Sequence, residues 1–275
     1  MALAHLNFQS GCLGNNTDVN ILLPDRPFDS KPGDFYASGK KYKVLWLLHG
    51  TFGDYSDWLR KSNIELYASE RNLMVVMPSG ANSNYVNWPG FATGYNAWDY
   101  LTEELMPLVQ GWFPASAQRE DNFIAGLSMG GNGAMQYAAA HPDKFAGAAS
   151  LSNAPTDLKQ MKKPQYDGKA EAGAAALFHK RVENLVENFG GLEGYIHSPI
   201  NVWDQLPKLM EAGTLPKLYF CCGEADSLIW EKYQTFKAHA QSIGLPARFE
   251  EEAGYSHEWR FWDKYLEQAL DYFGI

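Results

Sequence analysis

The chain has 275 residues, of which 45% are hydrophobic and 20% charged, and these proportions suit one large globular domain with a sizeable core. Its formal charge of −9 at pH 7 argues against nucleic acid or an anionic membrane as a partner. No apolar run approaches a transmembrane helix in length, residues 1–8 do not resemble a secretory signal, and the three cysteines have no disulfide spacing, so we expect a cytoplasmic protein.

Short apolar or alternating runs predict strands, and helical patterns separate most of them. The predicted strands cover residues 3–10, 17–23, 43–48, 73–78, 123–127, 145–152, 217–222 and 247–251. The predicted helices cover about residues 58–71, 101–112, 132–140, 228–243 and 259–273. The first two strands flank a Gly-Asn-Asn turn and form an antiparallel hairpin. Residues 43–48 are nearly continuously apolar, which is typical of a strand buried on both faces. The alternation of strands with helices predicts an α/β fold with a mainly parallel sheet and helices on both faces.

Residues 155–215 interrupt this alternation. Lys- and Ala-rich pieces alternate there with isolated aromatic residues, and no strong strand pattern occurs. We therefore expect a helical insertion within a single domain of residues 1–275, rather than a second domain.

The predicted strand at 123–127 ends in a Gly-x-Ser-x-Gly turn centred on Ser128, and a helical pattern of small residues follows. Strand, tight turn and helix are the context of a nucleophile elbow, in which the serine occupies a strained backbone conformation. Gly126 and Gly130 suit this turn because a Cβ at either position would collide with the neighbouring strand or helix. A bare Gly-x-Ser-x-Gly arises by chance in about one chain of this length in ten, so an acid and a histidine must follow.

Two later residues can complete a catalytic triad. Asp226 follows the strand at 217–222, and His257 follows the last predicted strand, so both lie at carboxyl ends of strands in the order serine, acid, histidine. Glu224 is the rival acid, and Asp226 could instead cap the helix that starts near residue 228. His49 precedes the serine, so we expect it to shape the oxyanion loop.

The oxyanion hole of such a site combines the backbone N–H after the serine, here Met129, with one from the loop after His49. Thr51 is our candidate for this second donor, with Phe52 as its competitor. A plain turn is the alternative role for this loop.

Other site types find little support in the residues. No His-x-x-x-His or Cys-x-x-Cys spacing suggests a metal, and no glycine-rich phosphate loop or other cofactor motif occurs. Four aromatic residues are candidates for the walls of a substrate pocket, although aromatic residues more often belong to the core. They are Phe91, Tyr95, Trp203 and Trp259.

The sequence resembles the esterase D and tributyrin-esterase group of α/β-hydrolases, which is related to feruloyl and acetyl-xylan esterases, S-formylglutathione hydrolases and mycolyltransferases. The resemblance rests on the stretches 47–50, 57–60, 75–78, 101–105, 124–131, 222–226 and 254–259. It implies the α/β-hydrolase fold, a carboxylesterase with Ser128, Asp226 and His257 as its triad, and an insertion that caps the acyl pocket. The Thr51-Phe52-Gly53 loop departs from the Leu-Thr-Cys type of the formylglutathione hydrolases, which argues against glutathione thioester chemistry.

We therefore expect a serine esterase that hydrolyses small-molecule esters with short acyl or feruloyl-type groups through an acyl-enzyme. The alternatives are acyl transfer to an alcohol, an S-formylglutathione hydrolase-like thioesterase and, from another class, a non-catalytic binding module. A homo-oligomer is compatible with the sequence.

Overall fold

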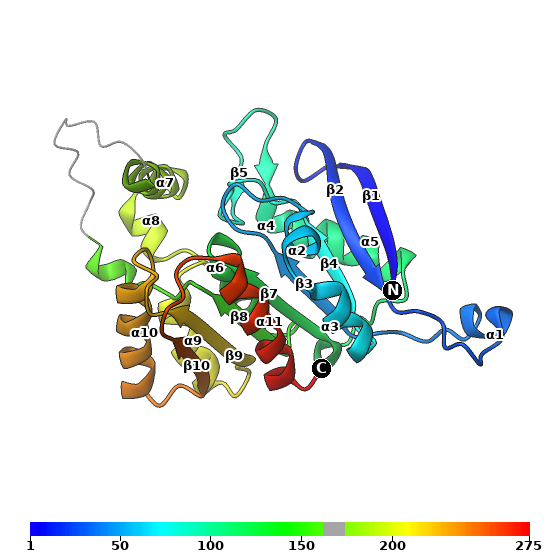
Figure 1. Ribbon diagram of the computed structural model, residues 1–275. Helices are drawn as coiled ribbons and strands as arrows, with labels where there is room; N and C mark the ends of the chain where they lie inside the picture. The colour runs from blue at the N-terminus through cyan, green and yellow to red at the C-terminus, as the bar shows by residue number, and fades with distance from the viewer. Residues whose placement is uncertain (162–173) are drawn as a thin grey trace.

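Figure 1 shows the computed structural model of the chain, which describes residues 1–161 and 174–275. An eight-stranded sheet forms its centre, with the strand order β1-β2-β4-β3-β7-β8-β9-β10. These strands are β1 (Ala2–Ser10), β2 (Asn15–Leu23), β3 (Val44–Leu48), β4 (Met74–Pro78), β7 (Asn122–Leu127), β8 (Gly147–Leu151), β9 (Lys217–Gly223) and β10 (Ala247–Glu252). All eight predicted strands are present, within a few residues of their expected bounds.

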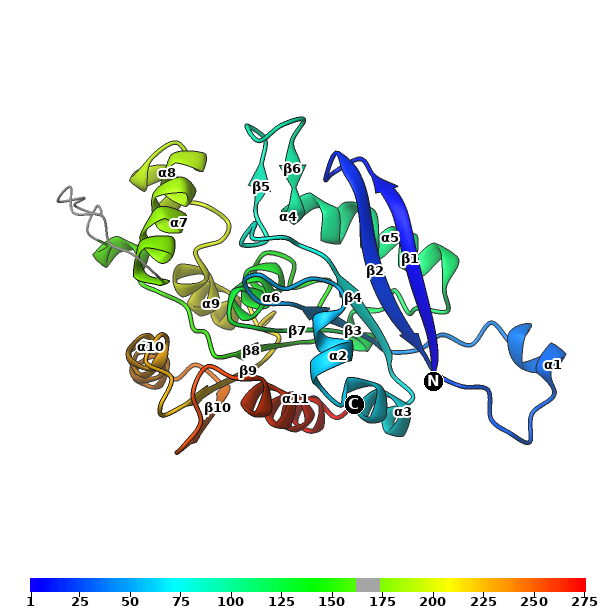
Figure 2. The ribbon, with the colours of Figure 1, turned by 45° about the horizontal axis from the view of Figure 1, so that its top comes forward.

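The sheet is mainly parallel, as expected. Only β1 with β2 and β2 with β4 run antiparallel among its neighbours, and the other neighbouring strands are parallel. The opening hairpin forms one edge of the sheet and β10 the other (Figure 2). Two short strands, β5 (Asn87–Trp88) and β6 (Tyr95–Asn96), make a separate hairpin in the long loop after β4.

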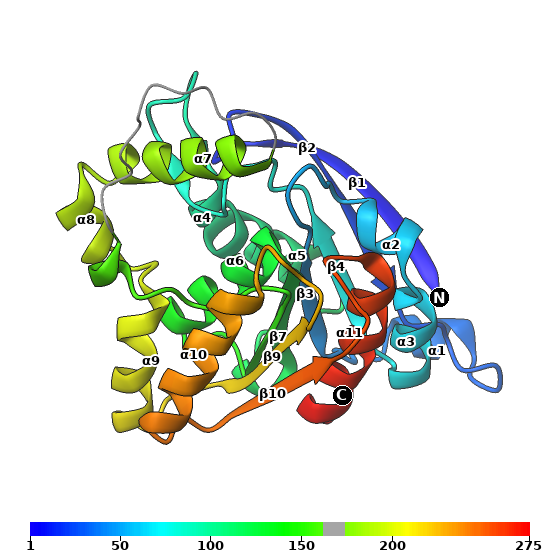
Figure 3. The ribbon, with the colours of Figure 1, turned by 60° about the vertical axis from the view of Figure 1, so that its left-hand side comes forward.

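Helices cover both faces of the sheet (Figure 3). Alternate strand residues point to opposite faces, so Trp46 and Ile124 pack into one hydrophobic cluster, whereas Leu45 and Phe123 pack into another. The first cluster includes side chains of α4 (Ala97–Asp99), α5 (Met106–Trp112), α6 (Met129–Ala140), α9 (Val202–Glu211) and α10 (Trp230–Ser242). The second includes side chains of α2 (Asp57–Lys61), α3 (Ile64–Arg71) and α11 (Trp259–Phe273). A short α1 (Pro32–Tyr36) lies in the loop after β2, apart from the sheet (Figure 1).

Two predicted helices differ from the structure. The helix predicted over 58–71 is divided into α2 and α3 because Ser62 is extended, and the N–H of Asn63 donates to Asp263 on α11 instead (2.8 Å). The helix predicted over 101–112 begins with a π-helical turn at Tyr100–Leu105, between α4 and α5. Trp112 does not belong to its buried face, because the side chain is 68% exposed.

The segment 155–215 contains helices where the structure describes it, as expected. Residues 162–173, which belong to its Lys- and Ala-rich part, lie outside the described residues. α7 (Ala174–Asn188) and α8 (Leu192–Ile196) share a small hydrophobic cluster that includes Leu185 and Tyr195. In contrast, α9 packs into the first of the two hydrophobic clusters on the sheet, through Val202 and Leu206. No helix among the described residues is long and apolar enough to cross a membrane.

Candidate active site

The turn between β7 and α6 holds Ser128 in a strained conformation. Its φ of 49° and ψ of −115° are unfavourable for a residue with a side chain, and such strain persists only where the surroundings enforce it. The N–H of Ser128 donates to the carbonyl oxygen of Leu151 on β8 (2.8 Å). Helix α6 begins at the next residue, so its first N–H groups have no partner within the helix. Ser128 therefore occupies the position predicted for the serine of a nucleophile elbow.

Two glycines make this turn possible. A Cβ on Gly126 would lie 2.4 Å from the carbonyl carbon and oxygen of Gly130. A Cβ on Gly130 would lie 2.5 Å from the carbonyl oxygens of Leu48 and His49. Backbone atoms cannot move aside as a flexible side chain can, so both positions require glycine.

Gly130→Ala is expected to lower the free energy of unfolding by at least about 3 kcal/mol, because the added methyl group overlaps backbone at the end of β3. Gly111→Ala is the matched control, because Gly111 lies in α5 and has no atom within 4 Å of an added Cβ. This control should instead be more stable by about 0.5–1 kcal/mol. Thermal and urea unfolding measure both, and equal stability of the two variants would contradict the packing argument.

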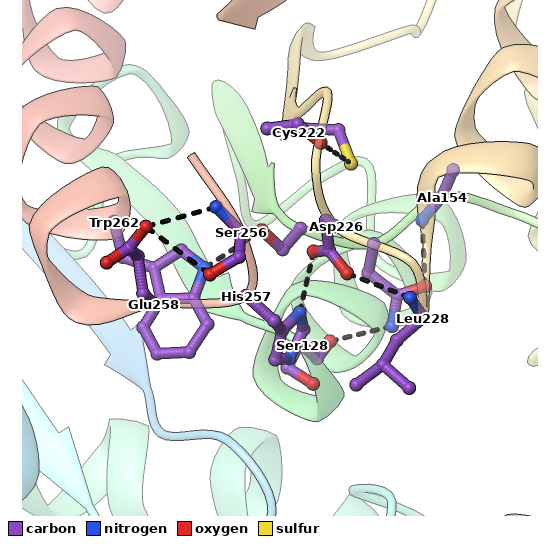
Figure 4. A network of polar contacts seen from close by, with 12 residues as sticks. Ser128, Ala154, Cys222, Asp226, Leu228, Ser256, His257, Glu258 and Trp262 are labelled. Atoms are coloured by element: carbon purple, nitrogen blue, oxygen red, sulfur yellow. Dashed lines mark hydrogen bonds and ion pairs between the residues drawn. The ribbon is translucent and has the colours of Figure 1, made fainter. Parts of the chain in front are cut away.

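Asp226 and His257 are brought together beyond the carboxyl end of β9. The side chain of Asp226 is buried, and its Oδ2 lies 2.7 Å from Nδ1 of His257 (Figure 4). Its other oxygen accepts the N–H of Leu228 at 3.2 Å, so Asp226 also supports the start of the following helix. An Nδ1–H that donates to the carboxylate leaves Nε2 of the imidazole free to accept a proton. Glu224, the rival acid, is exposed.

Ser128 and His257 are linked through a residue that follows β8 and a residue of α11. Ser152 follows Leu151, the residue that accepts the N–H of Ser128, and Trp262 donates its Nε1–H to the hydroxyl of Ser152 (2.9 Å). The ring of Trp262 in turn meets the imidazole of His257 edge to face, with centroids 4.9 Å apart. In the view of Figure 4 the imidazole lies between Asp226 and Ser128.

Within the described residues, no hydrogen bond joins the Ser128 hydroxyl to Nε2 of His257. Catalytic hydrogen bonds of this kind are often long before substrate binds. The serine, the histidine and the acid nevertheless lie on the same side of the sheet, beyond the carboxyl ends of β7, β10 and β9 respectively.

His49 fixes the loop that follows β3. Its Nδ1 lies 2.7 Å from the carbonyl oxygen of Gly50, and its Nε2 accepts the N–H of Gly80 (2.8 Å). Only the neutral tautomer with the proton on Nδ1 makes both bonds. Burial lowers the pKa of His49, which favours this uncharged form. Both ring nitrogens are therefore occupied, and His49 acts as a support for the loop, not as a base.

The two candidate oxyanion donors of this loop differ in their partners. The N–H of Phe52 donates to Oδ1 of Asn82 (2.8 Å), so it is already bonded within the protein. The N–H of Thr51 has no hydrogen-bond partner among the residues that the structure describes. Because a donor must be free to bind a developing oxyanion, this difference favours Thr51, together with Met129 at the start of α6.

A cavity of about 490 Å³ lies beside Ser128 and Met129. Its walls combine side chains of α6, of the segment after β8 and of the helices α7 to α10. The residues around it include Asn132, Gln136, Asn153, Thr156, Leu158, Arg181, Tyr195, Ile200, Asn201 and Lys232.

None of the four predicted aromatic pocket residues lines this cavity. Phe91 and Tyr95 instead line a separate cavity of about 340 Å³ beside the β5–β6 hairpin. Trp203 stacks on the ring of His239, with centroids 4.0 Å apart. Trp259 packs edge to face against Trp58 in the second core.

Asn153 and Lys232 are site residues that the sequence analysis did not identify. The side-chain amide of Asn153 donates to the carbonyl oxygen of Ser128 (2.7 Å), and its Oδ1 accepts the N–H of Ala154 (2.7 Å). The same Oδ1 accepts a hydrogen bond from Nζ of Lys232, also at 2.7 Å. No cluster of three metal-binding side chains occurs in the described part of the chain.

Comparisons with known proteins identify the family to which the chain belongs. The sequence model of the esterase family, described as "Putative esterase", matches residues 10–273. An acetyl esterase of Caldicellulosiruptor saccharolyticus is 32% identical over 99% of this chain and 98% of its own length. Two structures from Staphylococcus aureus are each 29% identical: fluorophosphonate-binding serine hydrolase F (TM-score 0.74, 99% and 98% of the two chains) and an S-formylglutathione hydrolase (TM-score 0.75, 99% of both). The chain thus belongs to the esterase family of α/β-hydrolases and is a serine-dependent carboxylic ester hydrolase.

Proposed function

We propose that Ser128, His257 and Asp226 are the catalytic triad of this esterase. The observation that carries the proposal is the 2.7 Å contact between Asp226 and Nδ1 of His257, at the same sheet edge as the strained turn of Ser128. In this arrangement Nε2 of His257 takes the proton of the Ser128 hydroxyl, and the serine oxygen attacks the ester carbonyl. Asp226 stabilises the imidazolium that forms.

The tetrahedral intermediate places its negative charge on the former carbonyl oxygen. In our proposal the N–H groups of Thr51 and Met129 stabilise this charge. His257 then donates its proton to the leaving alcohol, and the acyl group stays on Ser128. In the second half of the reaction His257 activates water, which releases the acid and restores the serine.

We further propose that the preferred acyl groups are short, with acetyl as the leading candidate. The relative from Caldicellulosiruptor saccharolyticus is an acetyl esterase and aligns over nearly the whole chain. The cavity beside Ser128 carries several side-chain amides, among them Asn84, Asn132 and Gln136. A long alkyl chain there would cover polar groups without bonding them, which is unfavourable. Residues of the segment 155–215 form part of the cavity wall, and we assign that segment the role of a cap over the acyl pocket.

A panel of 4-nitrophenyl esters tests this acyl preference. We expect kcat/KM to be highest for acetate and to fall at least about tenfold by octanoate, because buried amides would lose their hydrogen bonds to water. The ferulate ester and S-formylglutathione serve as comparison substrates. Labelling by a fluorophosphonate probe, blocked by prior acylation, shows that the protein is active in each assay. Faster hydrolysis of octanoate than of acetate would contradict the assignment.

For the cellular location we propose the cytoplasm. Cys12, Cys221 and Cys222 are all free thiols, and the last two are buried in β9. Free buried thiols suit a reducing compartment. Detection of the protein in fractionated cells tests this proposal.

A further inference from the structure

Lys232 places an ammonium group in the wall of the cavity that contains Ser128. It lies in the first turn of α10 and is partly buried, and its Nζ donates to Oδ1 of Asn153 (2.7 Å). Asn153 itself holds the carbonyl oxygen of Ser128, so a single side-chain amide separates the ammonium from the elbow backbone. A charge is therefore positioned close to the reacting serine.

The stability of the protein does not account for this lysine. A cation in the first turn of a helix faces the positive end of the helix dipole, where an acidic residue is preferred. The hydrogen-bonding partner of Lys232 is a neutral amide, and within the described residues no carboxylate pairs with it. Burial without a counter-charge lowers the pKa of Lys232 to about 8, so the ammonium form still predominates at pH 7.

The rest of the cavity wall also suits an anion. Among the described residues that line it, none is Asp or Glu, although the chain as a whole carries a formal charge of −9. The side-chain amides of Asn84 and Asn132 and the hydroxyl group of Thr156 add neutral hydrogen-bonding groups. A carboxylate in this cavity would find the ammonium of Lys232, the guanidinium of Arg181 and polar neutral groups, and no carboxylate side chain in the described wall.

We propose that the physiological substrate is an ester that carries a carboxylate a few bonds from its reacting carbonyl, and that Lys232 binds this carboxylate. The inference rests on the proposed function of Ser128 as the nucleophile. A hydrogen bond between an ammonium and a carboxylate is stronger than one to a neutral acceptor, so Lys232 selects the anionic ester over a neutral ester of the same shape.

Two pairs of isosteric esters test the proposal. Monoethyl glutarate and ethyl glutaramate differ only in the charge of the acyl half, whereas 4-acetoxybutanoate and 4-acetoxybutanamide differ only in the charge of the alcohol half. Hydrolysis is followed by pH-stat at pH 7. The quantity compared is the ratio of kcat/KM for the carboxylate to kcat/KM for the amide. We expect a ratio of about 10 or more in one of the two pairs, and that pair identifies the half that contacts Lys232.

The lysine is tested with K232Q, which removes the charge but keeps a donor for Asn153, and with K232R, which keeps the charge. We expect the ratio to fall to about 1 in K232Q and to be retained in K232R. K237Q is the matched control, because Lys237 lies on the same helix, outside the wall of this cavity, and pairs with Glu251 (2.8 Å). Its ratio should equal that of the wild type.

Several results would overturn the inference while leaving the proposed function intact. They are a wild-type ratio near 1 in both pairs, a high ratio that persists in K232Q, and an equal loss on both members of a pair in K232Q. The last result would make Lys232 a positioning residue for Asn153. If the wild type hydrolyses none of these esters or the aryl esters and takes no fluorophosphonate label, the proposed function itself fails.

Discussion

Replacing Ser128 with Ala is expected to lower kcat/KM for 4-nitrophenyl acetate by about 10⁵-fold or more and to abolish fluorophosphonate labelling. The physical reason is that the acyl group has no other acceptor once the hydroxyl is gone, and only binding and the oxyanion donors remain. The thermal midpoint should be nearly unchanged. Within the described residues the hydroxyl has no hydrogen-bond partner to lose, and alanine occupies the same strained backbone.

Ser227→Ala is a suitable control for that experiment. Ser227 is exposed and follows Asp226 directly, so this variant removes a hydroxyl close to the site in sequence but not from the proposed triad. Its activity should remain within about twofold of the wild type, as for most surface substitutions. Substantial activity in Ser128→Ala, with less than about a hundredfold loss, would show that another group is the nucleophile.

Asp226→Asn is expected to lower kcat by about 10⁴-fold. The Asn amide cannot accept the Nδ1–H of His257 on the nitrogen side, and when it donates instead, Nε2 carries the proton and cannot act as a base. The Asn oxygen can still accept the N–H of Leu228, so the start of the following helix should be preserved. Steady-state kinetics and the thermal midpoint together separate the lost base from any loss of folding.

Glu224→Gln distinguishes the two candidate acids. Glu224 is exposed, and among the described residues only its backbone N–H has a partner, the carbonyl oxygen of Glu252 (3.0 Å). This variant should keep its activity within about twofold. If Glu224→Gln lost as much activity as Asp226→Asn, the assignment of Asp226 as the triad acid would be wrong.

The parts of the fold that depend on local patterns were predictable from the sequence. Buried parallel strands are short apolar runs, so β3, β4 and β7 are visible without any tertiary information. The elbow can be recognised in the sequence because close backbone contacts require its two glycines. Gly126 contacts the backbone of Gly130, and Gly130 contacts the backbone at the end of the adjoining strand β3. The placement of Ser128, Asp226 and His257 on one side follows from topology, since each residue comes after a strand whose carboxyl end lies at the same end of the sheet.

Long-range contacts decided the features that the sequence did not predict. The break between α2 and α3 depends on Asp263, which is 200 residues away from the N–H it accepts. The aromatic pocket candidates failed to reach the cavity because the type of a residue does not fix the direction of its side chain. Trp203, for example, turns to His239 on the neighbouring helix.

Asn153 and Lys232 had no signal of their own in the sequence. Asn153 follows an ordinary buried strand, and Lys232 lies in a helix with several other charged residues. Their significance arises only when β8 and α10 meet beside the elbow, where the Asn153 amide bonds both partners at 2.7 Å. Contacts between segments that are 79 positions apart in the chain require the folded structure.

The cavity wall and the proposed triad come from different parts of the chain. Ser128, Asp226 and His257 follow strands of the rigid sheet, whereas Leu158, Arg181 and Tyr195 of the wall belong to the segment between β8 and β9. Changing the part of that segment before α9, which itself packs into the core, would therefore alter which esters fit without shifting the strands that align the three proposed catalytic groups. Substrate selectivity and catalytic turnover therefore depend on different parts of the chain. Libraries of variants confined to the wall-forming part of the segment offer a route to new substrates with the same proposed catalytic residues.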